Sequence, residues 1–176
     1  MSESTKRHKA EAPKKLNFGI FICSSSRYQL LKEGKLVKDV SGDLIEAGLK
    51  GAGHAVVFRK IIPDDKTMIQ EATESTLENG NLEVIVFCGG TGIAPSDITI
   101  ETVSPFLEKT LPGFGEIFRR LSYEQVGSAA VLSRAVAGVA KGKVFFCIPG
   151  SPDAVRISVE RLILPEAPHI VRHARE

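Results

Sequence analysis

Apolar side chains gather in short uninterrupted runs along this chain. Residues 16–23, 82–88 and 143–148 are apolar almost throughout, a pattern that is typical of strands buried on both faces of a sheet. Residues 54–62 form another strand-like run, which stops at Pro63. These segments are the predicted strands.

Segments with helical periodicity separate the predicted strands. Asp39 or Ser41 can cap the first helix, and Asp64 or Asp65 can cap the second. A short polar side chain at this position accepts a hydrogen bond from the first helical turn. These residues mark the predicted starts of the first two helices.

The later helical sequence contains prolines. Mixed helical sequence from about residue 98 to residue 121 is interrupted by a predicted turn at 111–113. Residues 154–175 are expected to divide into two helices at Pro165 and Pro168, because proline removes a backbone donor and crowds the preceding turn.

Buried strands joined by helices imply parallel pairing through right-handed crossovers. We therefore predict a three-layer, doubly wound α/β domain with a mostly parallel central sheet over residues 16–176. Residues 1–15 are polar and are expected to form a flexible tail. A basic anchoring arm is the alternative for this segment, since it is rich in lysine and arginine.

Composition narrows the class of protein. With 176 residues, 43% hydrophobic and 25% charged, the chain can bury one sizeable core. Its net charge of +2 carries no nucleic-acid signature. No window approaches the ~18–20 apolar residues of a membrane span, and no secretory signal begins the chain. A soluble, cytoplasmic protein with no nucleic-acid or membrane partner is expected.

The cysteines and histidines give little sign of chemistry. Cys23, Cys88 and Cys147 lie in apolar runs without a CxxC pair, so we interpret them as small buried side chains rather than as thiol nucleophiles. His169 and His173 share one helix face. Because neither an acid nor a third ligand is indicated by the sequence, no zinc site is predicted.

The glycine-rich segment Gly89-Gly90-Thr91-Gly92 directly follows a predicted strand. Glycines at a strand exit let backbone N–H groups approach a phosphate without an intervening Cβ atom. The segment contains neither a Walker loop nor a dinucleotide fingerprint. Taken alone it fits an anion-binding turn or simply a tight connection.

Carboxylates follow two of the predicted strands. Asp97 comes shortly after the glycine turn and Asp64 follows the strand at 54–62, so a doubly wound fold would bring both to one edge of the sheet. Carboxylate oxygens beside a phosphate-binding turn suggest Mg²⁺. Each aspartate also fits an ordinary N-cap.

Polar residues at other strand ends extend this pattern. Pro149, Gly150 and Ser151 follow the last predicted strand, and Ser24 lies in the predicted exit loop of the first. Ser133 and Arg134 add a hydroxyl group and a cation suited to phosphate. Turn chemistry and a solvated arginine are the alternative interpretations.

With these residues in view, the sequence resembles the MoaB/Mog family of molybdenum cofactor biosynthesis, which is related to the G domain of gephyrin. The resemblance runs from about residue 16 to the last residue. It rests on six segments in order: Asp39-Val40-Ser41-Gly42, Ile62-Pro63-Asp64-Asp65, Gly89-Gly90-Thr91-Gly92 with Asp97-Ile98-Thr99, Pro112-Gly113-Phe114-Gly115-Glu116, Leu132-Ser133-Arg134 and Pro149-Gly150-Ser151-Pro152.

The resemblance implies that molybdopterin and ATP, with Mg²⁺, give adenylylated molybdopterin and pyrophosphate. It assigns the catalytic and metal-orienting roles to Asp64 and Asp97. The implied substrate- and nucleotide-binding residues are Gly89, Gly90, Thr91, Gly92, Ser133, Arg134, Pro149, Gly150, Ser151, Ser24, Asp39 and Glu116. It also implies a homotrimer or homohexamer, for which Phe106, Phe114 and Phe118 are candidate contact residues.

The sequence departs from the family pattern at Ser96, where arginine commonly precedes the aspartate. Arg27, Lys66 and Arg134 are candidates to replace that guanidinium. A non-catalytic module that binds or delivers molybdopterin is therefore the first alternative. A nucleotide pyrophosphatase of the same fold is the second.

Overall fold

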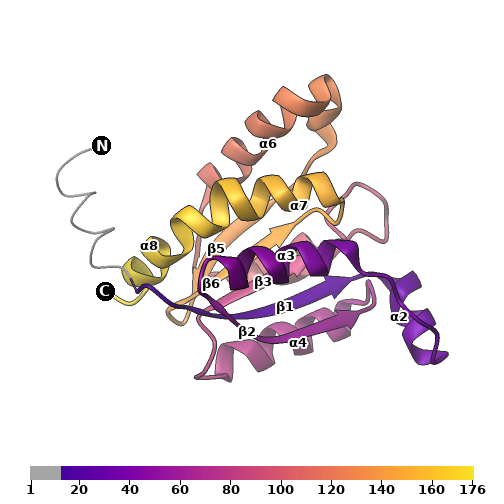
Figure 1. Ribbon diagram of the computed structural model, residues 1–176, viewed down its shortest axis with the longest axis horizontal. Helices are drawn as coiled ribbons and strands as arrows, with labels where there is room; N and C mark the ends of the chain where they lie inside the picture. The colour runs from indigo at the N-terminus through magenta and orange to yellow at the C-terminus, as the bar shows by residue number, and fades with distance from the viewer. Residues whose placement is uncertain (1–12) are drawn as a thin grey trace.

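The computed structural model describes residues 13–176, and they form the predicted three-layer α/β domain (Figure 1). A six-stranded sheet with the order β2-β1-β3-β6-β5-β4 lies at its centre. The strands are β1 (Asn17–Cys23), β2 (Ala55–Ile62), β3 (Val84–Cys88), β4 (Lys109–Thr110), β5 (Val136–Ala140) and β6 (Lys143–Ile148). Most of the predicted tail, residues 1–12, lies outside the described part of the chain.

Four neighbouring strands of the sheet are parallel. Strands β2, β1, β3 and β6 pair in parallel, whereas β5 and β4 are added antiparallel to β6. The chain runs from β1 to β2 at one side of β1 and then crosses back to β3 at the other side. A switch in strand order therefore lies between β1 and β3. The carboxyl ends of the parallel strands therefore meet at one edge.

Helices cover both faces of this sheet. Helices α3, α7 and α8 lie on one face, and α4 with α5 lies on the other (Figure 1). The helices are α2 (Ser25–Lys32), α3 (Val40–Gly51), α4 (Lys66–Glu78), α5 (Thr99–Val103), α6 (Pro112–Val126), α7 (Pro152–Ser158) and α8 (Leu164–Ala174). Shorter helical segments are η1 (Ser104–Phe106), η2 (Gly127–Leu132) and η3 (Val159–Ile163).

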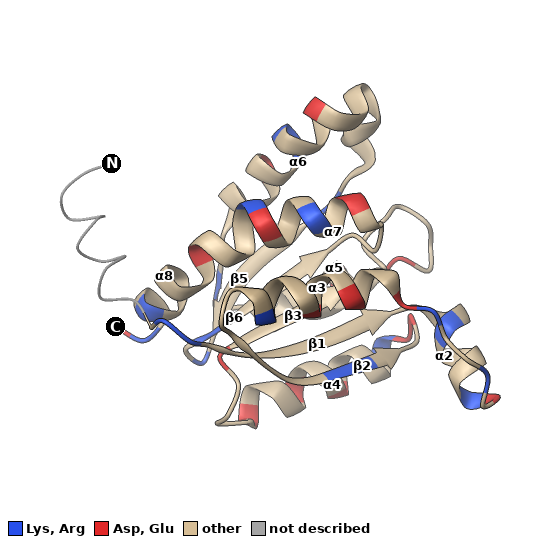
Figure 2. Cartoon of the chain, viewed as in Figure 1, with Lys and Arg blue, Asp and Glu red and all other residues tan. Residues whose placement is uncertain are grey.

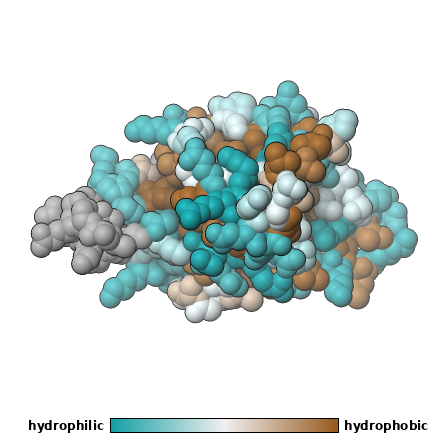
Figure 3. Space-filling view, turned by 90° about the horizontal axis from the view of Figure 1, so that it is seen from above, coloured by the Kyte–Doolittle hydropathy of each residue, from teal (hydrophilic) through white to brown (hydrophobic). Residues whose placement is uncertain are grey.

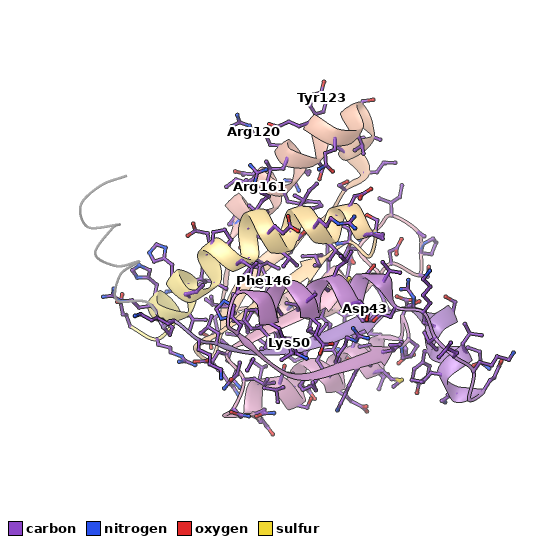
Figure 4. All side chains as sticks on the ribbon, viewed as in Figure 1. Asp43, Lys50, Arg120, Tyr123, Phe146 and Arg161 are labelled. Carbon is purple, nitrogen blue, oxygen red and sulfur yellow. The ribbon has the colours of Figure 1, made fainter. Side chains whose placement is uncertain are left out.

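The hydrophobic core follows the alternation of the strands. Ile20 and Ile22 of β1 pack with the α3 side of the sheet, and Phe21 packs with the α4 side. Phe146 of β6 lies beneath the helices α3, α7 and α8 (Figure 4). Burial on both faces explains why β1, β3 and β6 are apolar almost throughout. No described helix is long and apolar enough to span a bilayer.

Three local predictions are wrong. The predicted exit loop at 24–27 begins helix α2, none of whose residues is buried, so the helix has no apolar periodicity to reveal it. Strands β4 and β5 were not predicted; the first has two residues and the second contains small side chains and Gly138. The predicted turn at 111–113 starts α6, with Pro112 in its first turn, where proline is tolerated.

The C-terminal helices divide at a different place from the one predicted. The change comes in the π-helical turn η3, ahead of Pro165 and Pro168. Pro165 lies in the first turn of α8, where a missing N–H costs little. Pro168 lies inside α8, whose buried Ala167 and Val171 hold the helix against the sheet.

Candidate functional site

The candidate site is the edge of the sheet where the parallel strands end, and we call it the rim. It comprises residues 24–27, 63–65, 89–97 and 149–151, which directly follow β1, β2, β3 and β6. Acidic segments lie on the loops that leave the sheet beside α2 (Figure 2). The predicted clusters at separate strand ends are thus neighbours in space.

Asp64 connects the ends of β1 and β2. Its Oδ2 accepts hydrogen bonds from the backbone N–H and the hydroxyl of Ser25, at 2.9 and 2.8 Å. The backbone N–H of Asp64 donates to Ser25 Oγ at 2.9 Å. The N-cap of α4 is instead Asp65, which accepts from the Met68 N–H. The capping interpretation is therefore correct for Asp65 and wrong for Asp64.

The glycine turn after β3 requires its first two glycines. Gly89 has a φ of +104°, and a Cβ atom there would lie 2.3 Å from the carbonyl oxygen of Cys23. Gly90 has a φ of +63°, and a Cβ atom there would lie 2.9 Å from Asp64 Oδ1. Side chains at either position would meet the neighbouring strand exits. The turn is therefore pressed between the end of β1 and the carboxylate of Asp64.

Asp97 lies against the other end of the same turn. A Cβ atom on Gly92 would lie 2.5 Å from Asp97 Oδ2, which accepts a hydrogen bond from the Ala94 N–H at 2.9 Å. Helix α5 begins two residues later without a side-chain cap, so the capping interpretation of Asp97 is wrong. Within residues 13–176, no hydrogen bond engages Oδ1 of Asp64 or of Asp97.

Arg134 ties the turn to α5. Its Nε donates to the carbonyl of Thr91 at 3.0 Å, and its guanidinium also contacts the carbonyl of Asp97. The same group makes a bidentate ion pair with Glu101 and holds the pKa of that carboxyl below its usual value. Ser133 is half-buried directly beside it. Arg134 therefore places a guanidinium against the loop that contains Ser96.

The exit of β6 meets the glycine turn directly. A Cβ atom on Gly150 would lie 3.3 Å from Gly89 Cα. The carbonyl of Gly150 accepts a hydrogen bond from Ser41 Oγ at 2.7 Å, which attaches the start of α3 to the rim. Ser151 caps α7 and is exposed. Two glycine-containing turns therefore lie side by side.

Asp39 is buried beside the start of α3. Its Oδ1 accepts from the Gly42 N–H at 3.0 Å and caps the helix. Its Oδ2 lies 3.6 Å from Arg59 Nε and has no hydrogen-bond partner in the described part of the chain. A buried carboxylate oxygen without a donor is costly, so a ligand donor at this position would be favourable.

Not every predicted residue joins the rim. Ser24 lies there as the cap of α2. Glu116 is exposed on α6, outside the four segments that make up the rim. Sequence reasoning missed Ser25 and Glu101 as partners of site residues. Nothing in the sequence pairs them, because each contact joins segments more than 30 positions apart.

The cysteines lie behind the rim and are unsuited to nucleophilic chemistry. All three are buried without a disulfide. Burial raises the pKa of the Cys23 thiol to about 12 and also raises the pKa values of Cys88 and Cys147. A thiolate would be rare at neutral pH, in keeping with the prediction of small buried side chains.

A hollow elsewhere fits an anionic ligand poorly. About 420 Å³ of space lies between the end of α4 and the β5–β6 connection. Its lining residues are Glu74, Leu77, Glu78, Phe106, Glu108, Ala140 and Lys141. Three carboxylates against one ammonium would repel a phosphate, so the rim remains the candidate site.

Comparison with known proteins identifies the family of this chain. A family model described as a probable molybdopterin binding domain matches residues 19–169. Molybdenum cofactor biosynthesis protein B of Bacillus cereus is 44% identical, over 95% of either chain. A probable molybdopterin adenylyltransferase of Methanocaldococcus jannaschii is also 44% identical, over 93% of this chain and 96% of its own.

A solved structure shows the same fold. The crystal structure of the tungsten cofactor synthesizing protein MoaB from Pyrococcus furiosus superposes with a TM-score of 0.82 and 41% identity, covering 94% of this chain and 100% of that chain. The family model and these relatives each span most of the chain. The chain therefore belongs to the MoaB/Mog family of molybdenum cofactor biosynthesis proteins.

Proposed function

We propose that this chain is a molybdopterin adenylyltransferase that uses ATP and Mg²⁺. A terminal phosphate oxygen of molybdopterin attacks the α-phosphorus of ATP, the bond to the β-phosphate oxygen breaks, and pyrophosphate leaves. The observation that carries the proposal is the placement of Asp64 and Asp97 against the two ends of one glycine turn. The names of relatives at 43–44% identity support the same reaction.

The adjoining turns at Gly89 and Gly150 suit two phosphate-bearing ligands. Backbone N–H groups of residues 89–92 and 149–151 are proposed to hold the triphosphate and the adenylate. Without Cβ atoms at Gly89 and Gly150, phosphate oxygens can approach the backbone closely. Alignment of two bound reactants supplies much of the acceleration in phosphoryl-type transfers.

The carboxylates fit Mg²⁺, which prefers a few carboxylate oxygens together with substrate phosphates. Asp64 and Asp97 each use one oxygen to fix the loop and retain Oδ1. When bound, Mg²⁺ neutralises phosphate charge. Both carboxylates orient the ligands, and Arg134 supplies a fixed positive charge against the 91–97 loop.

The pterin is proposed to bind near the start of α3. The amide and amino groups of a pterin are hydrogen-bond donors, and Oδ2 of Asp39 is an acceptor without a donor among the described residues. Ser133 and Ser24 are proposed to contact its phosphate. Glu116 remains a candidate only from the family resemblance.

Arg134→Ala is expected to weaken binding of molybdopterin and ATP about tenfold, because it releases the 91–97 loop and leaves Glu101 unpaired at an anion site. Arg134→Lys should recover part of the affinity, since it keeps the charge but loses the bidentate geometry. Fluorescence titration would measure both. Arg156→Ala is the control, because Arg156 pairs only with exposed Asp153 among the described residues. Equal losses in both variants would contradict the role of Arg134.

Release of pyrophosphate tests the proposed function directly. The purified protein should release pyrophosphate only when ATP, Mg²⁺ and molybdopterin are all present. A molybdopterin-binding module would bind the pterin without releasing pyrophosphate. Hydrolysis of ADP-ribose in the presence of Mg²⁺ and without the pterin would instead favour the pyrophosphatase alternative.

We also propose a homo-oligomer, and we place its contact surface on α6 and η2. Phe118 is fully buried and cannot contribute, whereas Phe106 and Phe114 are only partly buried and Phe114 packs against Phe146. Apolar side chains instead lie exposed along α6 and η2, where Tyr123 points away from the sheet (Figures 3 and 4). They are Ile117, Tyr123, Val126, Val131 and Leu132.

Val131→Asp is expected to dissociate this oligomer. Val131 is 81% exposed, so a charge at this position should lower the stability of the folded monomer very little. Burying the same charge in an apolar contact between subunits should strongly destabilise that contact. Light scattering at micromolar concentration should show a trimer or hexamer for the natural sequence and smaller species for the variant. A monomer in both cases would contradict the proposal.

A further inference from the structure

Helix α8 carries a pair of histidines whose ring nitrogens converge. His169 and His173 lie one helical turn apart, with Nε2 atoms 3.0 Å from each other. The ring centroids are 4.7 Å apart and the ring planes are inclined by 63°. Both side chains remain partly accessible, with 21% and 44% of their surfaces exposed.

A carboxylate faces the other nitrogen of each ring. His169 Nδ1 lies 3.4 Å from Glu166 Oε2, and His173 Nδ1 lies 2.8 Å from Glu176 Oε2. An ionised carboxylate only accepts hydrogen bonds, so each Nδ1 must carry the hydrogen. In neutral imidazoles the lone pairs of both Nε2 atoms then face each other at 3.0 Å. This arrangement repels unless a cation lies between them.

We propose that His169 and His173 form a binding site for a divalent transition-metal ion. Imidazole nitrogen is a preferred ligand of Cu²⁺, Ni²⁺ and Zn²⁺. With a metal ion about 2.0–2.1 Å from each Nε2, the angle between the two metal–nitrogen bonds would be roughly 90°. This angle matches adjacent ligand positions in tetragonal Cu²⁺ or Ni²⁺ geometry. A shared proton is the competing occupant.

The surrounding groups support metal binding. Carboxylates on the remaining N–H of metal-bound histidines fix the ring tautomer and raise the basicity of the ligand nitrogen. Glu166 and Glu176 occupy these positions, so the structure supplies the acids that the sequence did not indicate. No cluster of three or more metal-ligating side chains forms within residues 13–176. Water would therefore complete the coordination, and Cu²⁺ should bind most tightly.

This site is separate from the rim. Helix α8 ends at the opposite end of the sheet from α2 (Figure 1). The two sites also differ in chemistry, since a pair of imidazoles selects borderline transition metals and the rim offers oxygen ligands to a hard cation. Failure of one assignment leaves the other intact.

Titration of the full chain with Cu²⁺ near neutral pH, followed by calorimetry and electron paramagnetic resonance, tests the proposal. One equivalent of Cu²⁺ should bind, and its electron paramagnetic resonance spectrum should show hyperfine coupling to nitrogen. His169→Asn or His173→Asn should each weaken binding at least tenfold, and Glu166→Gln about tenfold. His8→Asn, which retains both His169 and His173, is the matched control and should bind Cu²⁺ normally.

Unchanged affinity in the double variant His169→Asn/His173→Asn would overturn the proposal, as would a loss of binding confined to His8→Asn. Zn²⁺ gives an independent measurement, because it is diamagnetic. The imidazole proton resonances of both histidines should shift together on addition of one equivalent. Protonation alone would give a pH-dependent shift that Zn²⁺ does not alter.

Discussion

Replacing Asp64 or Asp97 by asparagine is expected to lower the turnover number by about 100-fold. Asparagine keeps the shape of the side chain, and its oxygen can still accept the hydrogen bonds from Ser25 or Ala94. The lost charge is the one proposed to hold Mg²⁺ against the phosphates. Turnover should therefore fall far more than pterin affinity or melting temperature. Steady-state rates of pyrophosphate release would measure the effect.

Asp65 offers a neighbouring control on the same loop. It caps α4 through the Met68 N–H, so Asp65→Ala should cost about 1 kcal/mol of stability and leave the turnover number nearly unchanged. Asp65→Asn should be neutral because asparagine also caps helices. Wild-type turnover in both Asp64→Asn and Asp97→Asn would remove the catalytic role of the carboxylates and favour a binding module.

Gly89→Ala is expected to disrupt both stability and activity. A Cβ atom there would lie 2.3 Å from the Cys23 carbonyl oxygen, and the φ of +104° disfavours any side chain. The conformational cost of about 1–2 kcal/mol adds to this overlap, so the free energy of unfolding should fall by about 3 kcal/mol or more. The melting temperature should fall by roughly 10 °C. Pyrophosphate release should fall with it, because the turn is the proposed phosphate site.

Gly51→Ala is the matched control for this substitution. Gly51 lies in α3, and no atom beyond its chain neighbours and the backbone of its own helix lies within 4 Å of an added Cβ atom. Alanine favours a helix over glycine by roughly 0.5–1 kcal/mol, so stability should hold or rise. Calorimetry measures the melting temperature of each variant. If Gly89→Ala melts at the same temperature as the natural sequence, the turn adopts a conformation different from the one described.

The sequence predicted the layers of the fold because burial leaves a readable pattern. Strands β1, β3 and β6 are apolar on both faces, and Asp39 and Asp65 cap helices where a cap was expected. Helix α2 escaped prediction because none of its residues is buried. Strand β4 has only two residues, which is too short for an alternation of apolar and polar residues to be recognised.

The composition of the rim was predictable, but its contacts were not. Topology places the ends of parallel strands at one edge, which brought Asp64 and Asp97 together with the glycine turn. Sequence alone could not separate a catalytic carboxylate from a cap at Asp64, since the distinction depends on the distant Ser25. The partnership of Arg134 with Glu101 likewise joins segments with no common pattern.

Transfer of label from ATP to molybdopterin tests the central claim most directly. ATP radiolabelled at its α-phosphorus should pass the label to the pterin in the presence of Mg²⁺, and ATP labelled at its γ-phosphorus should release the label in pyrophosphate. The label on the pterin should be strongly reduced in Asp64→Asn and Asp97→Asn. Binding of molybdopterin without any transfer of the α-label by the natural sequence would contradict the account.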